Sequence, residues 1–210
     1  MQVQDVITYN QKVAKNITDK EVAQCFYDND YSILLKFLRT GPKTIKEIEE
    51  YYKLEGNEKS DKTIYRYIST LSDAGLVVEA GKRIYTDDEF KNKSLTIYMR
   101  TAKVFNDLTK EMRSDMTKDK KFKRGYEAFR ILLDLSDENK SFNEDCIAKI
   151  IEKVYIDGID LASSLMEKVD EKIFDLLEGY DFGDVNDFIL NTAWLLMIHK
   201  NDFKKILDEC

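Results

Sequence analysis

The segment KSDKTIYRYISTLSDAGLV, residues 59–77, contains most of the information about how this chain folds. Ser60 is a residue type that caps helices, and Gly75 is a residue type that ends them. Between them, apolar side chains recur at the three- and four-residue spacing of one helix face: Ile64, Tyr67, Ile68 and Leu71. The segment therefore predicts a helix over residues 60–74 with this apolar face turned inward.

The opposite face of the predicted helix is polar and partly cationic. Its residues are Asp61, Lys62, Tyr65, Arg66 and Ser69. Lys62 and Arg66 are four residues apart, so both side chains point the same way. The major groove of DNA accepts a helix whose exposed face carries cations and hydrogen-bonding groups. The same pattern is also common on helices that only face solvent.

Two helices and a hairpin are predicted around this segment. Residues 31–38 and 44–55 carry apolar faces, and Thr44 with Glu47 forms a capping box at the start of the second. After Gly75, strand-favouring runs lie on either side of Gly81-Lys82, which predicts a two-stranded hairpin over residues 76–86 with its turn at that pair. The predicted order is three helices followed by a hairpin.

Residues 31–86 resemble winged helix-turn-helix domains of the ArsR/MarR type. The resemblance lies in Ser60-Asp-Lys-Thr-Ile-Tyr-Arg66, followed by Leu71-Ser-Asp-Ala-Gly-Leu-Val77. It implies that the recognition helix binds DNA through Lys62, Tyr65 and Arg66. The further DNA-binding residues expected from the sequence are Ser60, Thr63 and Ser69 on the same helix, and Lys82 and Arg83 at the tip of the hairpin wing. ArsR-type metal sensors carry a cysteine pair on the preceding helix, and residues 44–55 contain no cysteine, so metal sensing is not expected.

The chain after the hairpin is predicted to be helical. A long helix over residues 87–112 has an imperfect heptad spacing, suited to pairing with a second copy or to packing on its own domain: Leu95, Tyr98, Ala102 and Phe105. Further helices over about 126–135, 142–156, 159–178 and 185–210 predict a helical bundle, and its inner faces include Phe129, Ile131, Leu132 and Leu135. The expected fold is mainly α, in three parts. Residues 1–86 are expected to hold N-terminal helices and the winged helix-turn-helix, residues 87–124 the long dimerisation helix and a basic segment, and residues 125–210 an acidic helical domain.

Charge is distributed unevenly along the chain, whose net charge is −7. Residues 31–124 hold 21 Lys and Arg against 15 Asp and Glu, a net charge of +6. Residues 125–210 hold 9 against 20, a net charge of −11. This asymmetry suggests that one surface of the molecule faces an anion.

The sequence also excludes several classes of protein. No apolar run is long enough to span a membrane, and no phosphate-binding, dinucleotide-binding or hydrolase motif is present. Three widely spaced cysteines and one histidine predict neither a disulfide framework nor a metal site. We therefore expect a cytoplasmic protein that is not an enzyme and needs no cofactor.

Two functions remain open at this point. The first is sequence-specific binding of double-stranded DNA by a homodimeric transcriptional regulator, with residues 125–210 dimerising or receiving an unidentified small-molecule or protein effector. The second is a winged-helix scaffold that binds protein partners and does not bind DNA.

Overall fold

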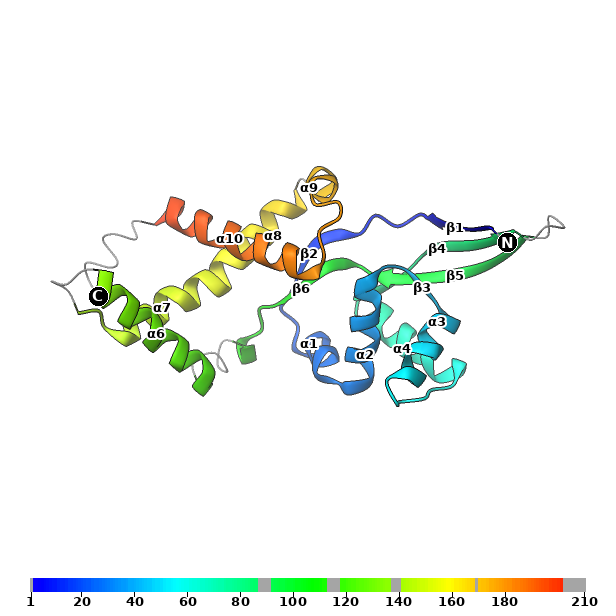
Figure 1. The fold of residues 1–210 in the computed structure, drawn as a ribbon, viewed down its shortest axis with the longest axis horizontal. Helices are drawn as coiled ribbons and strands as arrows, with labels where there is room; N and C mark the ends of the chain where they lie inside the picture. The colour runs from blue at the N-terminus through cyan, green and yellow to red at the C-terminus, as the bar shows by residue number, and fades with distance from the viewer. Residues whose placement is uncertain (1, 87–91, 113–117, 137–140, 169, 202–210) are drawn as a thin grey trace. The chain divides into compact units, whose positions relative to one another are not determined.

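In a computed structural model of the chain, the structure describes residues 2–86, 92–112, 118–136, 141–168 and 170–201. The chain forms two compact units (Figure 1). Unit 1 comprises residues 1–15 and 21–103, and unit 2 comprises residues 16–20 and 104–210. Every helix in the described ranges is too short or too polar to cross a membrane.

Unit 1 contains a four-stranded antiparallel sheet in the order β1-β4-β5-β3. Its strands are β1 (Gln2–Ile7), β3 (Lys43–Thr44), β4 (Val77–Thr86) and β5 (Asn92–Arg100). β4 and β5 pair from Val77 opposite Arg100 to Thr86 opposite Asn92. β1 forms an edge of the sheet and pairs with β4, which places Asp5 opposite Arg83.

The helices of this unit are α1 (Lys20–Tyr27), α2 (Asn29–Phe37), α3 (Ile45–Leu54) and α4 (Asp61–Asp73). A short 3₁₀ turn, Leu38–Thr40, follows α2. Figure 1 shows α2, α3 and α4 on the same face of the sheet. Fully buried side chains from these three helices form the core beneath them: Leu34, Ile48, Tyr52, Ile64 and Leu71. Ile97 of β5 is also fully buried and lies in a separate cluster with Ala80 and Met99.

A two-stranded sheet is formed by β2 (Lys12–Ile17) and β6 (Ala102–Asp107). The Lys12 amide donates a hydrogen bond to the Thr101 carbonyl, and the Leu108 amide donates one to the Ile17 carbonyl. Early residues of one strand thus lie beside early residues of the other, so the two strands run parallel.

Unit 2 is helical beyond β6. Its elements are α6 (Lys120–Ser136), α7 (Glu144–Lys153), a π-helical turn (Val154–Gly158), α8 (Ile159–Glu167), α9 (Asp170–Leu176) and α10 (Phe182–Lys200). Tyr126 of α6 packs in a buried cluster with Phe142, Ile147 and Ile151. The apolar face of α10 is buried along the helix at Val185, Ile189, Ala193 and Met197.

The predicted mainly α fold class is wrong, because the protein is mixed α/β with two sheets. Strands β1 and β2 lie where N-terminal helices were predicted. The predicted long helix over 87–112 is the largest error, since β5 and β6 occupy most of it. In β5, Ile97 and Met99 are buried while Tyr98 between them is not, and β6 alternates buried and half-buried residues along its whole length. This period of two is that of a strand.

Gly81 does not form the predicted turn. β4 continues through it, with a β-bulge between Glu79 and Gly81. At Gly81, with φ of 148°, a Cβ atom would lie 2.0 Å from the carbonyl oxygen of Val6 in β1. The glycine is therefore required because β1 approaches the backbone closely there. The connection from β4 to β5, residues 87–91, lies outside the described residues.

Candidate nucleic-acid interface

Helix α4 forms as the sequence predicts. Ser60 caps it, with its Oγ accepting a hydrogen bond from the Thr63 amide at 3.4 Å. The predicted inner residues Ile64, Tyr67, Ile68 and Leu71 are all buried. At the other end Gly75, with φ of 66°, allows the Leu76 amide to donate to the Leu71 carbonyl at 2.8 Å, which closes the helix.

The outer face of α4, defined here as Lys62, Tyr65, Arg66 and Ser69, is exposed. Tyr65 is 53% exposed although it is a large aromatic residue. The guanidinium of Arg66 lies 5.8 Å from the centre of the Tyr67 ring, a distance at which a cation and a ring attract each other. Ser60 is exposed and Thr63 is half-buried at the start of the helix.

The helix is held in unit 1 by hydrogen bonds to Asp30 at the start of α2. The Asp30 carboxylate accepts hydrogen bonds from the Tyr67 hydroxyl at 2.5 Å and the Asn57 amide at 2.7 Å, and pairs with Lys59 at 3.0 Å. The hydrogen bond from Tyr67 lowers the pKa of Asp30 below its ordinary value, and the same bond raises the pKa of Tyr67. Asp28 caps α2, and its carboxylate accepts hydrogen bonds from the amides of Asp30 and Tyr31.

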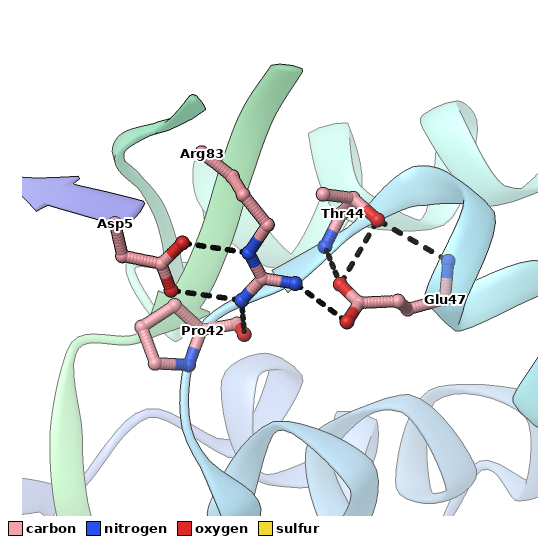
Figure 2. A network of polar contacts seen from close by, with 5 residues as sticks. All are labelled: Asp5, Pro42, Thr44, Glu47 and Arg83. Atoms are coloured by element: carbon pink, nitrogen blue, oxygen red, sulfur yellow. Dashed lines mark hydrogen bonds and ion pairs between the residues drawn. The ribbon is translucent and has the colours of Figure 1, made fainter. Parts of the chain in front are cut away.

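Arg83 lies in the middle of β4 and not at a hairpin tip. Figure 2 shows its guanidinium between two carboxylates, with Nε 2.6 Å from Asp5 Oδ1 and Nη1 2.5 Å from Glu47 Oε1. Nη2 also donates to Asp5 Oδ2 at 2.8 Å and to the Pro42 carbonyl at 3.2 Å. Only 13% of the side chain is exposed. Arg83 therefore connects β1, β4 and the start of α3, and its donors are engaged within the protein.

The network continues from Arg83 into the cap of α3. Glu47 Oε2 accepts hydrogen bonds from the Thr44 amide at 2.7 Å and the Thr44 hydroxyl at 2.9 Å, which confirms the predicted capping box (Figure 2). The hydrogen bond from Arg83 lowers the pKa of Asp5. Burial alone would raise the pKa of Glu47, but its bonds to Thr44 and Arg83 outweigh burial and lower it.

Lys82 also lies within β4. Its Nζ is 2.8 Å from Glu79 Oε1 and donates to the Thr96 hydroxyl of β5 at 2.7 Å. The pair of Lys82 and Glu79 is about half exposed, with 48% and 55% of the two side chains accessible. Neither of the two cations expected at the turn lies in one, because β4 continues through Gly81 to Thr86.

A groove of about 540 Å³ lies beside the outer face of α4. It is lined by α3, the first turns of α4 and β5, including Lys46, Glu49, Asp61, Tyr65 and Lys93. Lys46 and Lys93 are exposed and add positive charge, whereas Glu49 and Asp61 add negative charge. The pKa of Glu49 is raised, chiefly by the neighbouring Asp61 carboxylate.

Lys46 and Lys93 were not recognised from the sequence. Lys46 lies in the first turn of α3, where a lysine gives no signal of its own. Lys93 lies in the stretch predicted as a long helix, and only the pairing of β5 with β4 and β3 places it beside α4.

The predicted dimerisation residues do not form one helix face. Leu95 and Tyr98 lie in β5, three residues apart on a strand, so they point to opposite faces of the sheet. Ala102 and Phe105 lie in β6, where Ala102 is fully buried and Phe105 is half-buried. The four residues therefore do not form the seam that was predicted to bind a second copy.

The described residues contain no group of three or more side chains able to hold a metal ion. Cys25 is free and buried. Cys146 is disulfide-bonded, which the wide spacing of the cysteines did not predict.

Comparison with known proteins yields no match, either to a protein family or to a curated protein.

Proposed function

We propose that unit 1 binds double-stranded DNA in a sequence-specific manner, as part of a dimeric transcriptional regulator in the cytoplasm, with α4 in the major groove. The observation that carries the proposal is the outer face of α4. Its cations and hydrogen-bonding groups are exposed, while the rest of the helix is fixed by its caps, its buried face and Asp30. A rigid helix that presents such a face is what the major groove accepts.

The order of elements in unit 1 supports the same role. α2, β3, α3, α4, β4 and β5 follow one another along the chain, and β3 pairs with β5. The three helices and β3 support the winged-helix resemblance of residues 31–86, while the second strand of the wing is β5, beyond the predicted bound. In this arrangement Arg66 is suited to bidentate hydrogen bonds with a guanine edge, and Lys62 and Tyr65 to phosphate oxygens.

The groove beside α4 extends the proposed DNA-binding surface. Lys46 of α3 and Lys93 of β5 line its wall together with Tyr65. We assign phosphate binding to these two lysines in place of Arg83, whose donors are engaged by Asp5 and Glu47. Side chains that bind phosphate position the protein on the duplex and do not depend on sequence.

A second function is favoured by one observation. Glu49 and Asp61 bring two carboxylates into the same groove, and negative charge beside α4 opposes the approach of phosphate. Under this alternative, unit 1 is a scaffold that docks a protein segment in the groove, with Lys46 and Lys93 pairing with acidic side chains of the partner.

Selection from a random-sequence duplex pool, followed by fluorescence anisotropy with the selected duplex, separates the two functions. If DNA is the partner, Arg66→Ala should lower the affinity by about tenfold or more, because its guanidinium would no longer bind a base edge. Lys62→Ala should weaken binding to all duplexes alike and should reduce the slope of log affinity against log salt by about 1, because one phosphate is no longer neutralised.

A matched control for the double variant Lys62→Ala/Arg66→Ala is the double replacement of Lys36 and Lys53 by alanine. These two lysines are exposed in the last turns of α2 and α3 and do not line the groove. The control removes the same number of charges and should leave affinity for the selected duplex nearly unchanged. If no duplex is retained even at low salt, DNA binding is refuted and the scaffold function is favoured.

A further inference from the structure

An apolar face of α6 in unit 2 is open to solvent. Phe129, Ile131, Leu132 and Leu135 are 50%, 45%, 64% and 74% exposed. Another face of the same helix is already buried, because Tyr126 packs with residues of α7. Contiguous exposed apolar side chains on a folded unit mark an interaction surface, whereas single ones do not.

The exposed face has an ordered pattern. Gly125, Ala128, Leu132 and Leu135 are spaced by three, four and three residues, which is the a/d spacing of a helix that pairs with another helix. The two residues nearer the start of α6 are small, and the two nearer its end are large. At Gly125 an added Cβ atom would meet nothing within 4 Å, so space beside it is open. We call these four residues the α6 seam.

We propose that the α6 seam binds the same seam of a second copy of this chain, with the two α6 helices antiparallel. In this arrangement Gly125 lies opposite the partner's Leu135, and Ala128 lies opposite the partner's Leu132. Each pair of facing residues, which we call a layer of the interface, then joins one small and one large side chain. This fills the space between the two helices evenly. A parallel pair would place alanine on alanine and leucine on leucine, which leaves gaps at one end and crowding at the other.

The flanking apolar residues fit the same two-fold arrangement. The centre of the seam lies between Ala128 and Leu132, so Phe129 and Ile131, on its two sides, are close to the two-fold axis. An isologous interface brings each residue near its own counterpart there. Phe129, Ile131, Leu132 and Leu135 are then all covered by one partner, without requiring a second surface.

Charge favours the antiparallel orientation over the parallel one. The start of α6 is strongly basic, with exposed Lys120, Lys121, Lys123 and Arg124. A parallel pair would bring these two basic clusters side by side, and like charges repel. An antiparallel pair keeps them at opposite ends, each beside the C-terminal end of the partner helix, where the helix dipole attracts cations. Within the seam region Arg130 is paired with Asp134 at 2.6 Å.

The proposed dimer goes beyond DNA binding and does not depend on it, so the test is made without DNA. Sedimentation equilibrium of the full chain should give twice the monomer mass of 24.6 kDa. Leu132→Glu should reduce the species to a monomer at the same concentration. The matched control is Leu195→Glu on α10, which is 69% exposed and should leave the dimer intact. A wild-type monomer, or a dimer that survives Leu132→Glu, would overturn the proposal.

Exchanging the small and large residues tests the orientation. Leu132→Ala alone places alanine opposite alanine in two layers, and Ala128→Leu alone places leucine opposite leucine. Each should weaken the dimer by at least about tenfold. The double variant Ala128→Leu/Leu132→Ala restores one small and one large residue in each layer and should recover most of the affinity. If it dimerises no better than the single variants, the antiparallel register is refuted. If the wild-type chain forms the dimer but binds no duplex, the DNA-binding proposal has failed. If it binds the duplex but is a monomer, the α6 dimer has failed.

Discussion

Replacing Arg83 by methionine tests how unit 1 holds its edge strand and its helices together. The substitution keeps an unbranched side chain of similar reach but removes a guanidinium that donates four hydrogen bonds to Asp5, Glu47 and the Pro42 carbonyl. Breaking a buried charge pair costs about 3–5 kcal/mol. Here Asp5 and Glu47 are 27% and 35% exposed and regain water when the arginine is removed. We therefore expect a loss of about 2–3 kcal/mol at pH 7.

The loss should depend on pH, with a sign fixed by the two carboxylates. Both pKa values are lowered in the folded protein. Such groups contribute stability that is fully present above their unfolded pKa, about 4, and that disappears as pH falls through the lower folded value. The difference between wild type and Arg83→Met should therefore be full at neutral pH and should shrink between about pH 5 and pH 3.

Urea denaturation followed by circular dichroism, at pH 7 and at pH 3, measures this difference. Lys82→Met is the matched control, because Lys82 is the adjacent cation on β4 but its pair with Glu79 is about half exposed. An exposed pair is worth at most about 1 kcal/mol, so the control should cost less than Arg83→Met. Equal losses for the two variants, or a loss for Arg83→Met that is the same at both pH values, would refute this account of the network.

Other substitutions are expected to have the following effects. Gly81→Ala should release β1 from β4, because its Cβ would lie 2.0 Å from the Val6 carbonyl oxygen, and amide hydrogen exchange of residues 2–7 should rise by at least about tenfold. Gly56→Ala is the comparison, since it also has positive φ but open space around it, and exchange in β1 should not change. Tyr67→Phe should cost about 1–3 kcal/mol by removing a donor to the Asp30 carboxylate, measured by the same urea denaturation. A cost within error of zero would show that the hydroxyl does not hold α4.

Helix α4 was predictable from sequence because several independent signals agree there. A cap at Ser60, an apolar stripe of period 3.6 and a glycine at the end all describe the same helix. The capping box at Thr44 and Glu47 is of the same kind. The sequence did not indicate that Glu47 also binds Arg83. Its Oε2 completes the capping box, while its Oε1 accepts a hydrogen bond from Arg83, a residue 36 positions away.

The strands β5 and β6 were missed because short apolar runs fit two periods at once. Leu95, Tyr98 and Ala102 match a helical spacing, while Leu95, Ile97 and Met99 match the alternation of a strand. Whether such a run forms a helix or a strand depends on strands distant in sequence that pair with it. β5 pairs with β3 and β4, and β6 pairs with β2. The same error displaced the hairpin turn to Gly81, where the strand in fact continues beside β1.

Four large, exposed apolar side chains of α6 illustrate a different limit of sequence reasoning. Their pattern predicted an inner face, and Phe129, Ile131, Leu132 and Leu135 are instead exposed in the single chain. A hydrophobic pattern reports that a face is suited to burial, but it does not identify which surface covers that face. If a second copy covers it, the prediction of burial holds for the assembly and fails only for the isolated chain. The interface predicted on β5 and β6 and the one inferred on α6 can therefore be separated by experiment, because Leu132→Glu disrupts only the second.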